Sequence, residues 1–284
     1  MYTLTLRLPI SFYFIFLPNT FLNNRFEAPF TWDEMHHNMV FPNALHRHFE
    51  SVDSTNDEAA RWLKSGQIPE GSRVMADYQT NGKGQRNSTW QSESGQNLMC
   101  SFILYPKAQA ECGIFYFSKA IACAVRDTIA DCGCDDVTIK WPNDILIGRK
   151  KTAGILIENQ WTTHGWNSAI VGMGINLNQR NFEGLTATSI SEKSGKSWSS
   201  KEVHFILEQH IHHYYQLFLA EKFEEIDNYY HRHLFGLNST ENFEMGNAAF
   251  VGIITRVSSG GLLEIQRESG ELQVFEMKEV KLIL

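Results

Sequence analysis

Asn143, Asp144 and Lys151 bring an amide, a carboxylate and an ammonium group together in one short stretch of the chain. They lie in the runs KWPND and KTAGILIE, and Gly154 of the second run would let a ligand approach the backbone closely. Converging on one pocket, these groups suit a phosphate-bearing ligand bound with the help of a metal ion. The alternative is a hairpin whose charged turn is simply solvated, and these residues alone leave both open.

Three short strands joined by tight corners must position these groups. Pro142 fixes its own φ and favours an extended Trp141, which makes the first corner stiff. Gly148 and Arg149 suit a hairpin turn at the second corner. The strands themselves are predicted from aliphatic runs at 137–139, 145–147 and 155–157.

A second polar cluster, Ser54-Thr55-Asn56, lies at the predicted start of a helix that ends at Gly66. Thr55 and Glu58 have the spacing of a capping box. Capping accounts for one hydroxyl but not for all three polar side chains, and a helix N-terminus also attracts anions. A purely structural cap remains open as the alternative.

The loop from Gly82 to Trp90, which follows Gln79, is polar, rich in glycine and positively charged. It does not complete a dinucleotide fingerprint, because Asn87 stands where the third glycine belongs and no apolar helix follows. A polar loop of this length is typical of a mobile lid, and an unstructured surface loop is the alternative.

The remaining pattern predicts an α+β protein with a mixed or antiparallel sheet flanked by helices. Asn176 would end a buried strand at 168–177, where its amide could point into a site. The histidines around His210 and His213 are expected to be solvated or capping side chains rather than ligands of a metal site. Further strands are predicted at 45–49, 72–78 and 97–105, helices at 113–131 and within 201–234, and a small antiparallel C-terminal β-barrel from strands at 248–255, 262–267, 272–277 and 280–284.

Composition narrows the class of protein. The 284 residues are 43% hydrophobic, which suits a folded core rather than disorder. The net charge of −7 argues against nonspecific nucleic-acid binding. The five cysteines are an odd number without paired metal spacing, so we expect free or structural thiols in a reducing cytoplasm.

Residues 1–38 are predicted to be an extension that the fold does not need. The apolar stretch there is too short for a membrane span and lacks the features of a signal peptide. We therefore expect three segments: 1–38 as a dispensable extension, 39–237 as the main domain, and 238–284 as the small barrel, which would dock on the main domain.

From about Leu45 onward, the chain resembles biotin protein ligase, or biotin–[acetyl-CoA-carboxylase] ligase. The resemblance rests on motifs in a fixed order, of which KWPND followed by K-x-x-GIL-x-E is the most specific. The others are DSTN at Asp53–Asn56, Tyr78-Gln79 with the glycine loop, and GMGIN at Gly172–Asn176. It looks like the enzyme-only form without an N-terminal DNA-binding domain.

This resemblance implies ATP-dependent formation of biotinyl-5′-AMP and transfer of biotin to a lysine of a biotin carboxyl carrier domain. Partners would be biotin, ATP with Mg²⁺ and the carrier, without DNA or membrane, for a monomer or a homodimer. Lys151, Arg86 and Asp144 would be catalytic, with Asp144 near the metal. Biotin would contact Ser54, Thr55, Asn56, Gln79, Lys83, Gly84, Gln85, Lys151 and Gly154, and ATP would contact Arg86, Trp90, Asn143, Asp144 and Asn176.

The predicted lid departs from the family pattern Gly-Arg-Gly-Arg-x-Gly. Lys83 and Gln85 replace the two arginines and lose their bidentate recognition of phosphate. Arg86 is retained and could carry part of that role. The departure bears on retention of the adenylate rather than on the type of reaction.

Two other functions are considered. A lipoate or octanoate ligase or transferase shares the architecture, but it is expected to lack KWPND, and the polar Ser54–Asn56 cluster suits a ureido ring better than a dithiolane. A non-catalytic biotin-responsive regulator is disfavoured by the acidic charge and by the expected lack of a DNA-binding domain.

Overall fold

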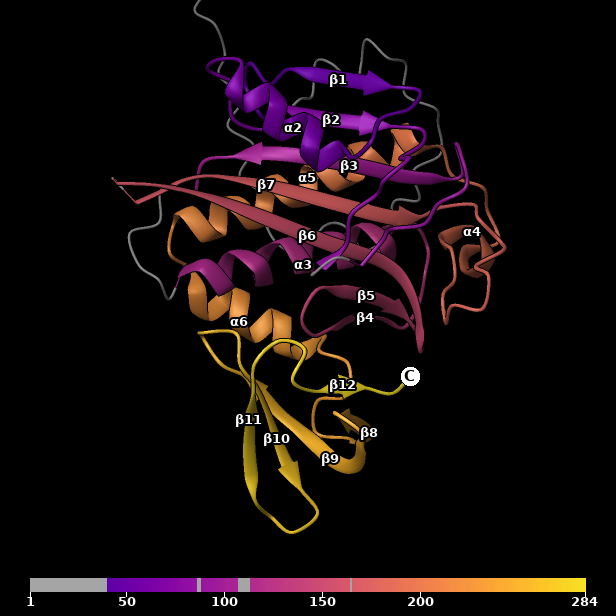
Figure 1. The fold of residues 1–284 in the computed structure, drawn as a ribbon, viewed down its shortest axis with the longest axis vertical. Helices are drawn as coiled ribbons and strands as arrows, with labels where there is room; N and C mark the ends of the chain where they lie inside the picture. The colour runs from indigo at the N-terminus through magenta and orange to yellow at the C-terminus, as the bar shows by residue number, and fades with distance from the viewer. Residues whose placement is uncertain (1–39, 86–87, 107–112, 164) are drawn as a thin grey trace, which may run out of the picture. The chain divides into compact units, whose positions relative to one another are not determined.

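The computed structural model describes residues 40–85, 88–106, 113–163 and 165–284 (Figure 1). The described residues belong to one compact unit, Met39–Leu284. The predicted extension at 1–38 and the candidate residue Arg86 lie outside the described residues, so their predicted roles stay predictions.

A seven-stranded mixed sheet forms the centre of this unit, in the order β1-β2-β3-β7-β6-β5-β4. Its β1–β2 pair is parallel, and every other neighbouring pair is antiparallel. The prediction of a mixed sheet is therefore confirmed. The strands are β1 (His46–Phe49), β2 (Arg73–Ala76), β3 (Asn97–Leu104), β4 (Val137–Lys140), β5 (Asp144–Ile147), β6 (Lys150–Thr162) and β7 (Gly165–Asn176).

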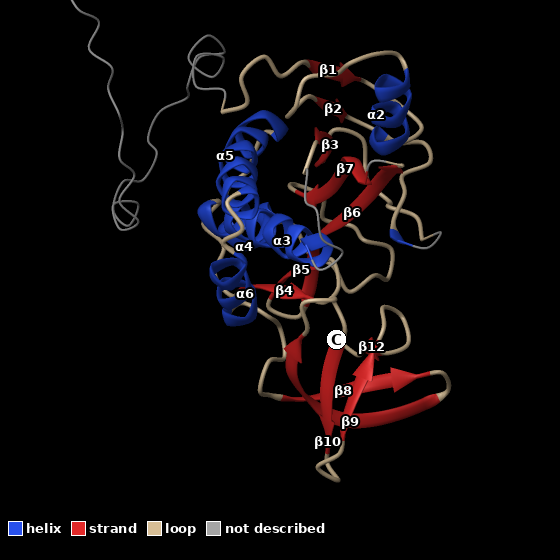
Figure 2. Ribbon diagram, turned by 90° about the vertical axis from the view of Figure 1, so that its left-hand side faces the viewer, coloured by secondary structure: helices blue, strands red, loops and turns tan. Residues whose placement is uncertain are grey.

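Helices cover both faces of the sheet (Figure 2). One face packs against α2 (Thr55–Lys64), and the other carries α3 (Gly113–Asp131), α5 (Ser200–Leu219) and α6 (Phe223–Arg232). The predicted helix at 113–131 is confirmed, and the helical region after Lys201 divides into α5 and α6. A short helix, α4 (Ile190–Ser194), lies between β7 and α5.

The larger core lies between the sheet and the second helical layer. Its fully buried aromatic side chains include Phe102 of β3, Phe117 of α3 and Tyr215 of α5. Each such side chain contributes about 1.5–3 kcal/mol through the apolar surface it removes from water. A smaller cluster around Ala59 and Trp62 lies under α2, so the strands that carry polar motifs are supported from both sides.

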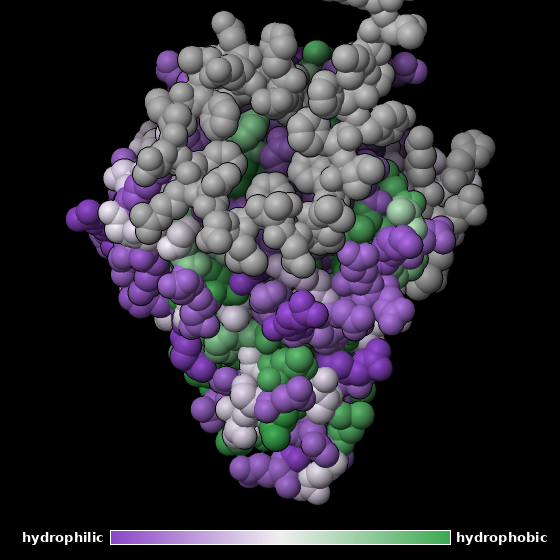
Figure 3. Space-filling view, turned by 180° about the vertical axis from the view of Figure 1, so that it is seen from behind, coloured by the Kyte–Doolittle hydropathy of each residue, from purple (hydrophilic) through white to green (hydrophobic). Residues whose placement is uncertain are grey.

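The C-terminal region forms a second, antiparallel sheet of five strands in the order β11-β10-β9-β8-β12. Its strand β8 was not predicted, because the sequence TENFEM is mostly polar. Several large hydrophobic side chains of this sheet are exposed, and in the rear view they are interspersed with hydrophilic ones (Figure 3). The strands are β8 (Thr240–Met245), β9 (Ala248–Val257), β10 (Leu263–Arg267), β11 (Leu272–Phe275) and β12 (Lys281–Leu282).

Polar contacts fasten the C-terminal sheet to the rest of the unit. The buried ammonium of Lys119 on α3 pairs with Asp227 and donates to the carbonyls of Val257 and Ser258. Burial lowers the pKa of Lys119, while its bond to Asp227 opposes that shift. Since an unpaired buried charge is costly, these contacts fix the end of β9 against α3.

A second set of contacts comes from the KWPND run and from the turn between β5 and β6. The indole N–H of Trp141 donates to the Gly261 carbonyl at 2.9 Å. Arg149, at the turn between β5 and β6, bonds Glu241 at 2.9 Å and the Ile283 carbonyl at 3.2 Å. The KWPND corner is therefore held against the C-terminal sheet as well as against its own strands.

The described cysteines, which exclude Cys112, are buried and unpaired. Burial raises the pKa of the Cys100 thiol to about 12, which makes it a poor nucleophile. No group of three potential metal-ligating side chains occurs among the described residues. None of the described helices is both long enough and apolar enough to span a membrane.

We expect His204 to make the protein sensitive to acid. Its ring is buried, stacks on Phe102, and lies beside His46 and Arg73. Burial, reinforced by Arg73 and His46, holds its pKa well below the ordinary value of about 6.5. Below pH ~6.5 the unfolded chain therefore binds a proton that the native chain refuses, and the free energy of unfolding falls by up to about 1.4 kcal/mol per pH unit.

Urea denaturation of His204→Phe between pH 7.5 and 5 should show a shallower decline than the unsubstituted protein. His48→Phe, a change at an exposed histidine on β1, serves as the control. Equal slopes for His204→Phe and the unsubstituted protein would contradict the assignment.

Candidate functional site

A cavity of about 610 Å³ opens between the central strands and the C-terminal sheet. Cavities of this size commonly hold ligands as large as a drug or a vitamin. Its walls come mainly from the start of α2, the glycine loop, the KWPND corner with strands β5–β7, and the C-terminal sheet. Of the predicted site residues, the cavity is lined by Ser54, Thr55, Asn56, Gln79, Lys83, Gly84, Gln85, Trp90, Asn143, Asp144, Lys151 and Gly154.

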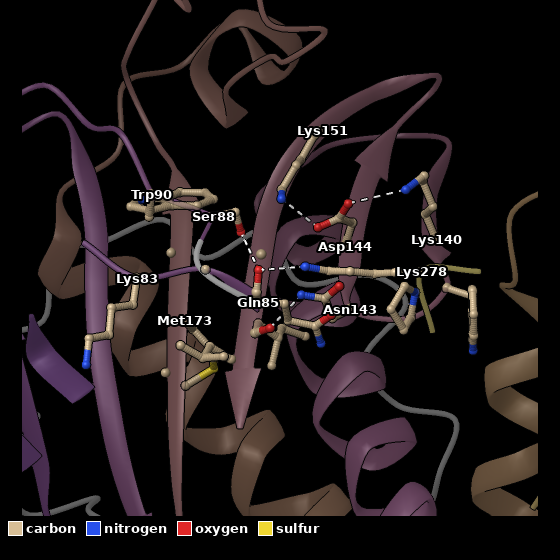
Figure 4. A pocket seen from close by; sticks show the side chains of 18 of the residues that line it. Lys83, Gln85, Ser88, Trp90, Lys140, Asn143, Asp144, Lys151, Met173 and Lys278 are labelled. Atoms are coloured by element: carbon tan, nitrogen blue, oxygen red, sulfur yellow. Dashed lines mark hydrogen bonds and ion pairs between the residues drawn. The ribbon is translucent and has the colours of Figure 1, made fainter. Parts of the chain in front are cut away.

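A carboxylate held between two lysines lies at one part of the cavity (Figure 4). The Nζ atom of Lys151 is 2.6 Å from Oδ1 of Asp144, and Nζ of Lys140 is 3.4 Å from Oδ2. About a third of the Lys151 side chain is exposed, so its ammonium remains accessible to a ligand. The arrangement fixes the Lys151 ammonium and leaves excess positive charge facing the cavity.

An irregularity in strand pairing aims Lys151 into the cavity. Along a regular strand, side chains three residues apart point to opposite faces. The β5–β6 ladder shifts register between Ile145 and Leu146, which places an extra residue in β6 between Lys151 and Ala153. Such bulges redirect side chains. As a result, Lys151 and Gly154 both line the cavity, and Gly154 lies opposite Asp144.

Glycines form the floor beneath Lys151 and Trp90. Gly154 of β6 pairs with Gly174 of β7. A Cβ at Gly174 would overlap the Trp90 indole, and one at Gly154 would press on both Trp90 and Lys151. The indole therefore lies directly against the sheet, with the Lys151 ammonium 5.6 Å from the ring centroid. The glycines of the GMGIN motif therefore allow side chains to pack directly on the backbone of the strands.

The polar cluster at the start of α2 packs on the same two strands, two residues away from the Gly154–Gly174 pair, a separation of roughly 7 Å. The Asn56 amide donates to Glu158 at 2.6 Å and to the Leu156 carbonyl at 3.4 Å. Its oxygen accepts from the hydroxyl of Ser101 at 2.6 Å. Because Leu156 pairs with Gly172, the cluster and the charged group share one β6–β7 floor.

Thr55 corrects one prediction. It lies inside α2 rather than capping it, the N-cap is Ser54, and no side-chain capping bond forms there. Its hydroxyl donates instead to Oε1 of Gln79 at 3.0 Å and accepts from Ser101 at 2.8 Å. Its backbone N–H also donates to Gln79, at 2.7 Å. The capping box predicted from Thr55 and Glu58 is therefore wrong, and the hydroxyl belongs to the cavity network.

The two predicted asparagines have different surroundings. Asn143 lines the cavity, but its amide donates to the Ile155 carbonyl at 2.7 Å and so holds the KWPND corner onto β6. Asn176 does not line the cavity: it is buried and donates to the Thr188 carbonyl at 3.0 Å. A longer bond of 3.5 Å joins it to the Lys151 carbonyl. In this structure its nearest link to the cavity is therefore through the backbone of Lys151.

Backbone hydrogen bonds join the two described sides of the glycine loop. Trp90 N–H donates to the Gly82 carbonyl at 2.9 Å, and Gly84 N–H donates to the Ser88 carbonyl at 2.7 Å. Lys83 points away from the Lys151 ammonium and pairs with Asp57 of α2, whose hydrogen bond raises the pKa of Lys83 (Figure 4). Its charge is therefore engaged by a carboxylate at the rim.

Several residues in or behind the cavity wall were not assigned a role from the sequence. Ser101 could have been noticed, since it is a hydroxyl in the otherwise apolar middle of β3. Lys140 belongs to the KWPND run, whose ion pair was not anticipated. No local signal distinguished the C-terminal contributors, which are Ile254, Leu263, Lys278, Val280, Lys281 and Leu282.

Residues 48–176 match the biotin/lipoate A/B protein ligase family. The bifunctional ligase/repressor BirA of Bacillus spizizenii is 30% identical over 237 residues, which cover 81% of this chain and 72% of that protein. The biotin–[acetyl-CoA-carboxylase] ligase of Paracoccus denitrificans is 35% identical over 128 residues, 44% of this chain and 52% of that protein.

The fold matches that of a solved structure over nearly the whole length of the solved structure. The biotin protein ligase of Aquifex aeolicus in complex with biotin and ATP aligns with a TM-score of 0.69 and 26% identity. The alignment covers 84% of this chain and 98% of that one.

We expect Gly172→Ala to disturb the polar cluster, because the added Cβ would overlap the Asn56 amide. Displacing Asn56 would strain its bonds to Ser101 and Glu158, for a loss of about 1–3 kcal/mol in the free energy of unfolding. Chemical denaturation followed by circular dichroism measures the change. Gly260→Ala is the matched control, since its added Cβ meets no atom closer than 3.9 Å. A loss no larger than that of the control would show that Asn56 is not tightly held.

Proposed function

The chain belongs to the biotin protein ligase family, and from this premise we propose that it joins biotin to a carrier protein in two steps. In the first, biotin and ATP form biotinyl-5′-AMP and pyrophosphate. In the second, a lysine of a biotin carboxyl carrier domain takes the biotinyl group and AMP leaves. The observation that carries the proposal is the single cavity that combines the Thr55–Gln79 network with the Lys151–Asp144 pair.

The polar cluster suits the ureido ring of biotin. A cyclic urea offers one carbonyl acceptor and two N–H donors, and its recognition requires fixed hydrogen-bonding partners of both kinds. Ser54, Thr55 and Gln79 supply hydroxyl and amide groups on the cavity wall. Because Ser101 and Glu158 hold this cluster from behind, little side-chain freedom is lost when the ligand binds.

The charged group suits the first chemical step. The biotin carboxylate, with a pKa of roughly 4–5 by analogy with other carboxylic acids, is already ionised at neutral pH and needs no general base. Its oxygen attacks the α-phosphorus of ATP as the bond to pyrophosphate breaks. Two anions must therefore meet, and Lys151 neutralises charge between them while Asp144 holds its ammonium in place. Positioning of this kind can contribute about 7–11 kcal/mol.

Magnesium fits this site as a companion of the nucleotide. Asp144 is the one carboxylate among the described residues that line the cavity, and two lysines already face it. Mg²⁺ is commonly held by one or two carboxylates together with substrate phosphates and water, so Asp144 would supply a single protein oxygen. When bound, the ion would neutralise phosphate charge and favour the departure of pyrophosphate.

The second step requires an uncharged amine. The acceptor lysine, with a pKa of about 10.4 in water, must lose its proton before its nitrogen attacks the acyl carbon. We propose that Asp144 assists in this transfer, since it lies beside Lys151 in the cavity. Trp90, Asn143 and Arg86 are proposed on the nucleotide side, with Asn176 acting through its bond to the backbone of Lys151.

The proposal extends to the organisation of the chain. Residues 39–237 would carry the ligase chemistry, residues 238–284 would complete the cavity, and residues 1–38 would be dispensable. A cytoplasmic location remains a prediction from the cysteine content.

We expect the purified protein, given biotin, MgATP and a carrier domain, to release one pyrophosphate for each biotin attached. Mass spectrometry of the carrier and a coupled pyrophosphate assay measure the two products. A parallel reaction with lipoate separates the alternative within the same family. Transfer of lipoate but not of biotin would move the assignment to a lipoate ligase.

Lys151→Ala should lower the rate of adenylate formation by two or more orders of magnitude, because it removes the charge placed between two anions. Single-turnover formation of biotinyl-AMP gives the rate directly. Lys150→Ala is a matched control: the preceding lysine pairs with Glu192 and does not line this cavity. A near-normal rate in Lys151→Ala would remove this lysine from the proposed chemistry.

A further inference from the structure

The C-terminal sheet touches the lid directly. Lys278, in the turn before β12, donates from Nζ to the carbonyl of Gln85 at 3.0 Å (Figure 4). Both residues line the cavity. The same carbonyl accepts from the Ser88 hydroxyl at 2.7 Å, so one oxygen joins the two sides of the loop to the C-terminal sheet. A hydrogen bond from a charged donor is stronger than one between neutral groups.

The cation in the described part of the lid, Lys83, does not face the C-terminal sheet. Lys83 pairs with Asp57 on α2, on the side of the loop away from Lys278. Gln85 is uncharged, and its side chain replaces an expected arginine. On the side that faces the C-terminal sheet, the described part of the lid is therefore held by Lys278, through the Gln85 carbonyl, and not by a charged side chain of the lid itself.

The turn that presents Lys278 is itself well fixed. Lys278 adopts a left-handed backbone conformation with φ of 73°. Glu276 N–H donates to the Glu279 carboxylate at 2.8 Å, and Glu279 N–H donates to the Glu276 carbonyl at 3.2 Å. Val280 is buried beside the cavity. A surface lysine on a free loop would not receive this support.

The C-terminal sheet that carries this turn is also held against strands of the central sheet. Arg149 binds Glu241 and the Ile283 carbonyl, and Trp141 binds the Gly261 carbonyl. The ammonium of Lys278 therefore has a defined position relative to β5, whose first residue is Asp144. Its contact with the lid spans two parts of the chain that are far apart in the sequence.

We propose that Lys278 is a positioning residue that fastens the lid from the C-terminal sheet and thereby retains the adenylate in the cavity. The retention part of this inference rests on the proposed function, whereas the fastening of the lid does not. An acyl-adenylate is lost by escape or hydrolysis when a lid opens, so a contact that keeps the lid closed lengthens its lifetime.

The first test examines the lid without any ligand. Trypsin can cleave after Lys83 when the loop opens, and Lys278→Ala should increase the rate of cleavage there about five- to tenfold, the effect of losing one solvent-accessible hydrogen bond. Lys278→Arg should restore slow cleavage, because it keeps the charged donor. Lys64→Ala, a change at an exposed lysine at the end of α2, should leave the rate unchanged. A wild-type cleavage rate in a folded Lys278→Ala protein would overturn the proposal.

The second test measures retention. With biotin and MgATP but no carrier, Lys278→Ala should release biotinyl-AMP about five- to tenfold faster than the unsubstituted protein, and Lys278→Arg should restore slow release. Release at the wild-type rate would overturn the role in retention. If the unsubstituted protein forms no adenylate, the proposed function fails instead, and the trypsin result still decides whether Lys278 fastens the lid. Thermal unfolding of each variant confirms that it is folded before either measurement.

Discussion

The ion pair between Lys151 and Asp144 is the contact on which the arrangement of the cavity depends. The pair depends on a bulge in β6 that turns Lys151 inward, and Gly154 leaves room for the lysine stem beside the strand. A regular β5–β6 ladder would place Lys151 and Gly154 on opposite faces of the sheet. The charge that the chemistry uses is thus a product of backbone irregularity, and the KWPND corner stabilises that irregularity through the Asn143 bond to Ile155.

The glycines of β6 and β7 explain how one floor serves two kinds of recognition. Gly172 receives Asn56, whereas Gly174 receives the indole of Trp90. Side chains at either position would fill the space into which these groups pack. The polar network and the charged group can therefore lie next to each other without an intervening wall, as a ligand with a neutral head and an anionic tail requires.

Local sequence patterns predicted the elements well where one physical signal dominated. Strands with continuous aliphatic runs and the amphipathic helix α3 were found, because burial alone specifies them. Strand β8 was missed because its alternating polar residues resemble a loop, and the capping role given to Thr55 was wrong because tertiary bonds to Gln79 and Ser101 took its hydroxyl. The contribution of Lys278 has no local signal, since it follows only from how the two sheets meet.

The segments that line the cavity are synthesised in a fixed order. A ribosome synthesises the start of α2 first, the β5–β7 floor later, and the Lys278–Leu282 wall after both. The central sheet can collapse early, because its strands and helices are complete before the second sheet has been made. A nascent chain would therefore hold a folded but open-sided pocket for a time, and that pocket would gain its last wall only when the segment at 278–282 emerges.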